Sequence, residues 1–260
     1  MRVDADERLW RNWPGSASPG NARAFGTRAQ DLNVDFALPR ADVVSALLQG
    51  SLYRDDGSWD GDSWSWTLAQ RLQGLLAIAL ASGVAPLALV HACDVCAEMI
   101  EIGLDAHDFV RAEDVVDFQW SPAPDRTLNV MLPRGHEQRR WSQVDALTPQ
   151  AMARELISGQ SSDAEFPSAW YDALARELEQ RDPLTALELE TECPSCATNV
   201  RIPFDLEATL LAQLQSRQRR LLSDIHRLAS AYHWSEAAIL ELPAWRRRAY
   251  LAQLGVAGHA

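Results

Sequence analysis

Two C-x-x-C pairs constrain the fold of this 260-residue chain more than any other feature of its sequence. Cys93 and Cys96 form the first pair, and Cys193 and Cys196 form the second, 100 positions later. These are the chain's four cysteines. Any fold must therefore explain why one short cysteine motif returns at a fixed offset.

The residues around the two pairs repeat at the same offset. Apolar residues alternate with other residues on both sides of each pair, which is typical of half-buried strands. Each copy therefore predicts a β-hairpin with the C-x-x-C at its tight turn. The matched positions are Leu87 and Leu187, Leu89 and Leu189, Ala97 and Ala197, Ile100 and Val200, Ile102 and Ile202, Leu104 and Phe204, and Asp105 and Asp205.

Two such turns facing each other supply the four ligands of a structural zinc site. A C-x-x-C turn points two sulfurs the same way, and zinc takes four thiolates tetrahedrally at about 2.3 Å. Zinc ribbons usually keep their two cysteine turns close in sequence, so here the second turn must return after an inserted segment. We predict one structural zinc ion, the expected cofactor, bound by Cys93, Cys96, Cys193 and Cys196.

Other uses of the cysteines fit the sequence less well. A thioredoxin-like redox pair opens a helix, whereas strand-like alternation follows both pairs here. Disulfides are typical of oxidising compartments, and no export signal is visible. A catalytic zinc keeps an open position, so His91 or Asp94 would have to replace a thiolate; we expect His91 to face outward from its strand.

The remaining sequence predicts an α+β fold. The zinc-centred, zinc-ribbon-like pair of hairpins carries N-terminal helices, an inserted hairpin plus helices, and a C-terminal helical arm. We divide the chain into a flexible N-terminal segment at 1–35, a zinc-binding α+β domain at 36–204 with an insert at 106–186, and the helical arm at 205–260.

Periodicity and capping residues locate the individual elements. Alternation predicts hairpin strands at 116–120 and 128–132. Gly83 is the expected glycine beyond the end of one helix. The predicted helices cover 42–52, 67–82, 148–157, 168–181, 205–232, 236–242 and 243–254.

Charge and hydropathy exclude several classes of protein. The net charge is −12, and residues 205–260 carry +2, so the first 204 residues carry −14. Such an acidic body repels phosphate backbones, which makes nucleic acid an unlikely partner. No segment reaches the roughly 18–20 apolar residues of a membrane helix. All 24 basic residues are Arg, which is typical of proteins from GC-rich bacterial genomes. Because no signal peptide is visible, we expect a location in the bacterial cytoplasm.

No catalytic motif is present. The sequence lacks G-x-G-x-x-G, a Walker loop, H-E-x-x-H and G-x-S-x-G. It therefore favours a non-enzymatic binding or scaffolding protein.

The C-terminal region carries a resemblance to a known family. Its residues are Leu221–Glu236, Ile239–Leu240 and Arg246–Leu251, preceded by the knuckle Cys193-Pro194-Ser195-Cys196. This region resembles the baseplate hub assembly proteins, or chaperones, of contractile phage tails and of extracellular contractile injection systems. The resemblance implies an assembly chaperone or minor structural component of a phage-tail-like particle. Its partners would be baseplate, hub or tail-tube proteins.

The resemblance covers about residues 182–254, including Asp182-Pro183 and Pro203-Phe204-Asp205. The Gly that follows the knuckle in many relatives is replaced by Ala97 and Ala197, so this turn must avoid or tolerate a positive φ. The N-terminal third matches no motif of the family.

We predict a partner-binding surface on the helical arm, because aromatic residues anchor interfaces and Arg is enriched there. Its residues are Trp234, Trp245, Arg246, Arg247, Arg248 and Tyr250. The alternative is that the same aromatic residues close a local core of three helices.

Two other functions remain open. A zinc-ribbon adaptor acting on nucleic acid, in transcription or DNA packaging, is the main alternative; the acidic body weighs against it. A redox enzyme using the C-x-x-C pairs is the other, and a bound zinc ion would exclude it.

Overall fold

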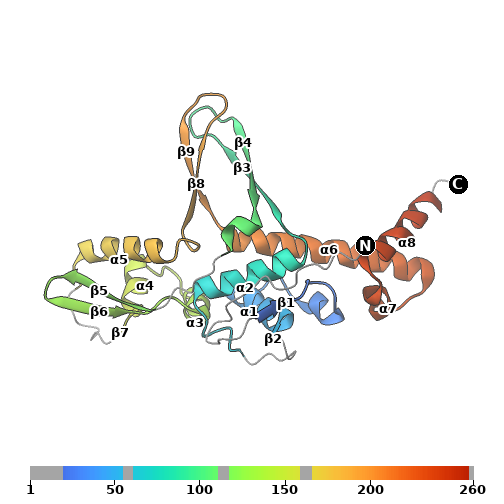
Figure 1. The fold of residues 1–260 in the computed structure, drawn as a ribbon, viewed down its shortest axis with the longest axis horizontal. Helices are drawn as coiled ribbons and strands as arrows, with labels where there is room; N and C mark the ends of the chain where they lie inside the picture. Colours follow the sequence, from blue (N-terminus) through green and yellow to red (C-terminus); the bar gives the residue numbers. More distant parts are fainter. Residues whose placement is uncertain (1–19, 55–60, 111–116, 159–165, 258–260) are drawn as a thin grey trace.

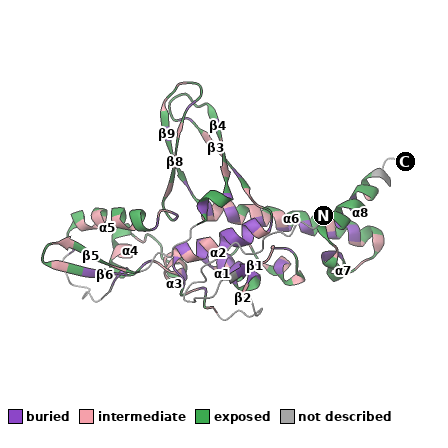
Figure 2. Cartoon of the chain, viewed as in Figure 1, coloured by how far each residue is buried: buried purple, intermediate pink, exposed green. Residues whose placement is uncertain are grey.

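A computed structural model describes residues 20–54, 61–110, 117–158 and 166–257 and has the predicted α+β fold. Helix α6 (Leu206–Tyr232) runs along the long axis of the molecule (Figure 1). Two hairpins rise beside it, a small sheet with two helices lies at one end, and α7 and α8 lie at the other. Figure 2 shows that the buried residues concentrate where α6 meets the N-terminal helices.

The main body is built from α1 (Arg40–Ser51), α2 (Leu68–Ala81) and the first half of α6. Thr67 caps α2, and Gly83 beyond its end has φ +78°, as expected of a terminating glycine. Helix α2 is buried around most of its circumference. Burying one large apolar side chain contributes about 1.5–3 kcal/mol, so packing holds this helix in place.

Residues 20–35, which we assigned to a flexible N-terminal segment, contain regular secondary structure. Strand β1 (Gly20–Ala22) pairs antiparallel with β2 (Leu52–Arg54), and the short 3-10 helix η1 (Ala29–Asn33) follows. The Phe25 side chain is buried in the main core. Residues 1–19 lie outside the described residues.

The predicted inserted hairpin is present, with its own core. Strands β5 (Phe118–Ala123), β6 (Arg126–Val130) and β7 (Ile157–Ser158) form an antiparallel sheet. Helices α4 (Pro149–Glu155) and α5 (Ser168–Arg181) accompany it. The start of the predicted first strand, at 116, lies outside the described residues. The buried residues of this unit are Trp120, Leu128, Val130, Leu156, Ile157, Phe166 and Leu174.

Part of the insert belongs to the main body instead. The 3-10 helix η2 (Ala106–Phe109) packs against α2, and so does α3 (Gly135–Trp141), a helix that the sequence does not predict. The fully buried Arg71 of α2 donates to the carbonyls of Ser63 (2.6 Å) and Ala41 (2.8 Å). It therefore ties α1 to the loop before α2.

The two cysteine hairpins stand side by side on the main body (Figure 1). Strand β3 (Pro86–Ala92) pairs with β4 (Met99–Asp105), and β8 (Leu187–Glu192) pairs with β9 (Asn199–Phe204). Both hairpins were predicted, and both are confirmed. Their facing sides share a small core of Leu89, Cys93, Ile100, Ile102, Leu189, Cys193, Cys196, Val200 and Ile202.

His91 does not face outward as predicted. It follows Leu87 and Leu89 at the period of two that puts side chains on one strand face, and its Nε2 atom is buried. His91 therefore lies on the inner side of the β3–β4 hairpin.

The C-terminal arm consists of α6, α7 (Glu236–Glu241) and α8 (Ala244–Ala257). Asp205 caps α6, and Ser235 caps α7. The apolar stripe of α6 packs first into the main core and then under α7 and α8. In the part of the chain that the structure describes, no helix is long and apolar enough to cross a membrane.

Candidate metal centre

The two C-x-x-C turns have the same backbone geometry. In the first, the Cys93 amide donates to the Glu98 carbonyl (2.8 Å) and the Ala97 amide donates to the Cys93 carbonyl (2.8 Å). In the second, Cys193 and Ala197 make the equivalent bonds at 2.9 Å. The sequence repeat is therefore a structural repeat down to individual amides.

The residue after each knuckle has a left-handed backbone. Ala97 has φ 59° and Ala197 has φ 56°, in the region that favours glycine. The turn therefore tolerates a positive φ rather than avoiding it. Both turns therefore contain the same sterically unfavourable backbone conformation, which indicates that the C-x-x-C turn geometry requires it.

The four predicted metal ligands come together at the hairpin tips. All four Sγ atoms lie within 4.8 Å of one another. Across the two hairpins, Cys93 Sγ lies 3.7 Å from Cys196 Sγ, and Cys96 Sγ lies 3.6 Å from Cys193 Sγ. Each hairpin thus contributes two sulfurs to one cluster.

These distances fit metal ligation and not disulfide bonding. A tetrahedral site with Zn–S bonds of about 2.3 Å has sulfurs about 3.8 Å apart, whereas a disulfide requires about 2.05 Å. All four cysteines are free. The cluster is consistent with a bound metal ion such as zinc, and its four donors fill a tetrahedral shell.

Hydrogen bonds make the thiols unequal in the metal-free cluster. Side-chain and backbone hydrogen bonds to Thr198 lower the pKa of Cys196 to about 6. At Cys96 the Glu98 backbone lowers the pKa, but desolvation and the neighbouring sulfurs outweigh it and raise the pKa to about 12.

Two polar residues lie near the cluster: Thr198 was not identified from the sequence, and His91 was predicted on the wrong strand face. Thr198 Oγ1 lies 3.4 Å from Cys196 Sγ, and His91 lies two residues before Cys93 on the inner strand face. Both are polar residues within strand-like stretches, and this polarity is the sequence signal that could have identified them as neighbours of the cluster. Asp94 is exposed, and neither it nor His91 belongs to the four-sulfur cluster.

The six predicted partner-binding residues do not form one surface. Trp245 is 66% exposed, and Arg246 and Arg248 are also exposed. Trp234 and Tyr250 are partly buried and pack edge to face, with ring centroids 5.0 Å apart. Trp234 and Tyr250 thus help to close the local three-helix core that was the alternative, whereas Trp245 lies outside it.

Arg247 lies inside this core. Its side chain is buried, and Nη1 donates to the carbonyls of Leu240 and Leu242, both at 3.1 Å. Arg247 therefore satisfies carbonyls at the end of α7, and it is not exposed as a residue of the predicted partner-binding surface would be.

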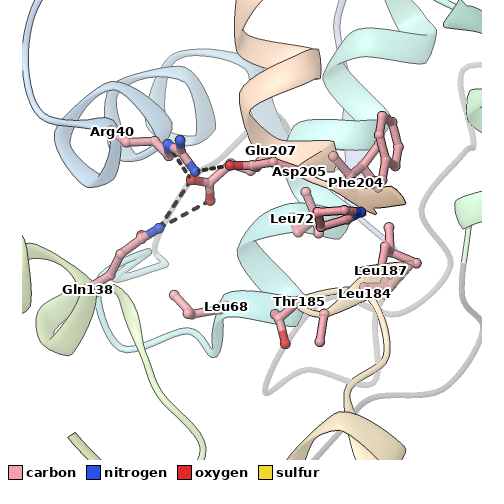
Figure 3. A pocket seen from close by; sticks show the side chains of 13 residues that line it. Arg40, Leu68, Leu72, Gln138, Leu184, Thr185, Leu187, Phe204, Asp205 and Glu207 are labelled. Carbon is pink, nitrogen blue, oxygen red and sulfur yellow. Dashed lines mark hydrogen bonds and ion pairs between the residues drawn. The ribbon is translucent and has the colours of Figure 1, made fainter. Parts of the chain in front are cut away.

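A cavity of about 550 Å³ lies at the base of the hairpins (Figure 3). Its polar groups bond to one another: Gln138 Nε2 donates to Glu207 Oε1 (3.1 Å), and Arg40 Nη1 donates to Asp205 Oδ2 (2.7 Å). Burial raises the pKa of Glu207. No histidine, cysteine or serine is among the described residues that line it.

Comparison of the chain with family models, with curated proteins and with solved structures finds no match.

Proposed function

We propose that the four cysteines hold one structural zinc ion, and that the chain is a non-catalytic assembly factor or minor component of a contractile, phage-tail-like baseplate. The zinc part rests on one observation, the convergence of four sulfurs from two distant hairpins. Four protein thiolates leave no open coordination position for a substrate, which suits a structural ion.

Cys93, Cys96, Cys193 and Cys196 would hold the ion, and zinc would supply a crosslink between two segments about 100 residues apart. The small core between the hairpins has five buried residues, and two of them are the ligands Cys93 and Cys193. A metal crosslink therefore offsets a weak apolar core, as it does in small zinc domains.

The assembly role rests on the resemblance of residues 182–254 to the baseplate family. The non-catalytic part is supported by the closed donor set and by the self-paired polar groups in the cavity. The proposed location is the bacterial cytoplasm, with possible partners among baseplate, hub and tail-tube proteins of the same particle.

Co-expression tests the assembly role. The chain would be produced with the sheath, tube and baseplate proteins encoded beside its gene, and particles would be counted by electron microscopy with and without it. We expect baseplates to be lost when the chain is omitted and restored when it is supplied. Normal particles in its absence would refute the role.

A further inference from the structure

The two cysteine hairpins share a fold but differ on their outer faces. On β8–β9 the outward residues of β8 are acidic: Glu188, Glu190 and Glu192. At the positions 100 residues earlier, β3 carries Ala88, Val90 and Ala92. Because the outer face of the β8–β9 hairpin is polar, a hairpin of this fold does not need an apolar outer face. The apolar residues on the outer face of β3–β4 are therefore not explained by folding.

This apolar face is open to solvent. Val90 is 56% exposed and Met99 is 59% exposed, and Val95 at the tip is 68% exposed. Exposed apolar residues that cluster on one face mark an interaction site more than scattered ones do. We name the outer face of β3–β4, with the tip residue Val95, the hairpin face.

Acidic groups surround the hairpin face. Residues 86–105, which form β3, β4 and their turn, contain four acidic residues and no Arg. The acidic residues are Asp94, Glu98, Glu101 and Asp105. An occupant of the hairpin face would therefore be apolar in part and cationic at its edges.

The same chain presents a surface of this chemistry on α6. Arg219, Arg220 and Arg227 are exposed on its solvent side, and among the described residues none of them forms an ion pair. Leu222 is 44% exposed at the edge of this side, next to Arg219 and away from Arg220 and Arg227. The neighbouring exposed positions are small, such as Ser216 and Ser223, so a flat sheet can approach the helix. We name this the helix face.

We propose that the hairpin face of one copy docks on the helix face of a second copy. Both faces are exposed in a single chain, so they do not cover each other there. A contact between two identical hairpin faces would oppose Glu101 of one copy to acidic groups of the other, which disfavours a symmetric pair. The contact is therefore head to tail, the type that forms rings or open chains.

The contact is weak because the face is small. A seven-residue strand spans about 23 Å at about 3.3 Å per residue. Interfaces of this size belong to the transient class. Self-association should therefore depend on concentration and weaken at high salt, because exposed charges are screened.

Sedimentation velocity on the full, metal-loaded chain over a concentration series tests the proposal. We expect oligomers at low salt and an apparent dissociation constant at least about tenfold higher at high salt. The variant Val90→Glu/Met99→Asn copies residues of the β8–β9 hairpin and should be monomeric. Arg219→Glu/Arg227→Glu should be monomeric too, whereas Glu192→Gln on the other hairpin should associate as the unmodified chain does.

A mixture of the Val90→Glu/Met99→Asn and Arg219→Glu/Arg227→Glu variants tests the head-to-tail contact most directly. Each retains one intact face, so a head-to-tail contact predicts a heterodimer that grows no further. An unmodified chain that stays monomeric at all concentrations, or a Val90→Glu/Met99→Asn variant that still associates, would overturn the proposal. So would a mixture that stays monomeric while circular dichroism shows both variants folded.

Discussion

At the residue scale, the four cysteines act as a unit. A single Cys193→Ser substitution leaves three thiolates and an incomplete shell, so it should lower the melting temperature almost as much as replacing all four cysteines. Ser195→Ala, in the same exposed turn, is the matched control and should change little. If Cys193→Ser melts like the unmodified chain, the cluster does not bind a metal that supports the fold.

The left-handed alanines predict an unusual gain in stability. At φ 56° a Cβ is strained, so Ala197→Gly should raise the free energy of unfolding by about 0.5–1 kcal/mol. Ala212→Gly, on the exposed side of α6, should lower it by about the same amount. Chemical denaturation would measure both, and a destabilised Ala197→Gly variant would contradict the assigned turn geometry.

Arg71 gives a third test at single residues. A Cβ on Gly135 would lie 2.5 Å from Arg71 Nη1, which is held by its bond to the Ser63 carbonyl. We expect Gly135→Ala to cost at least about 1 kcal/mol of stability, as overpacking does. Gly50→Ala, with nothing within 4 Å, should be neutral or stabilising. Equal stability of the two variants would show that the Arg71 site is loosely packed.

At the element scale, the sequence predicts those helices and strands whose apolar residues recur at a regular period. Long helices such as α2 and α6 and the duplicated hairpins follow clear patterns, and the cysteine cluster follows from the fixed offset of its two motifs. Helix α3 was missed because seven mostly polar residues show no apolar stripe. Strands β1 and β2 were missed because three-residue strands form only once their distant partner is placed.

The burial of individual charged side chains could not be predicted from the sequence either. Arg71 and Arg247 are buried although Arg usually faces solvent, and both donate to backbone carbonyls of other elements. Such roles depend on which carbonyls the tertiary fold leaves open. No local spacing encodes them.

In the helical arm, we expect substitution of the buried Arg247 to affect stability more than substitution of the exposed Arg246 and Arg248. Arg247→Met leaves carbonyls at the end of α7 without a donor, and each such buried group costs about 1–3 kcal/mol. Arg246→Glu/Arg248→Glu changes exposed positions and should shift stability by no more than about 0.5 kcal/mol. Thermal unfolding measures both, and comparable losses would contradict the burial of Arg247.

At the scale of the whole molecule, the described residues form four apolar cores of very different size. The main core joins residues from 22 to 214, whereas the core between the hairpins has five buried residues, two of which are cysteines. The inserted sheet and the end of the helical arm each have their own core. Loss of a metal ion should therefore loosen the hairpins first and leave α1, α2 and α6 packed.

The most direct test of the central claim is native mass spectrometry of the full chain purified under reducing conditions. The account predicts a mass increase of one zinc ion per chain, with four thiols protected from alkylation until a chelator is added. The Cys193→Ser variant should carry less zinc, and Ser195→Ala should carry the same amount as the unmodified chain. A metal-free chain with four freely alkylated thiols, or with its cysteines joined as disulfides, would contradict the account.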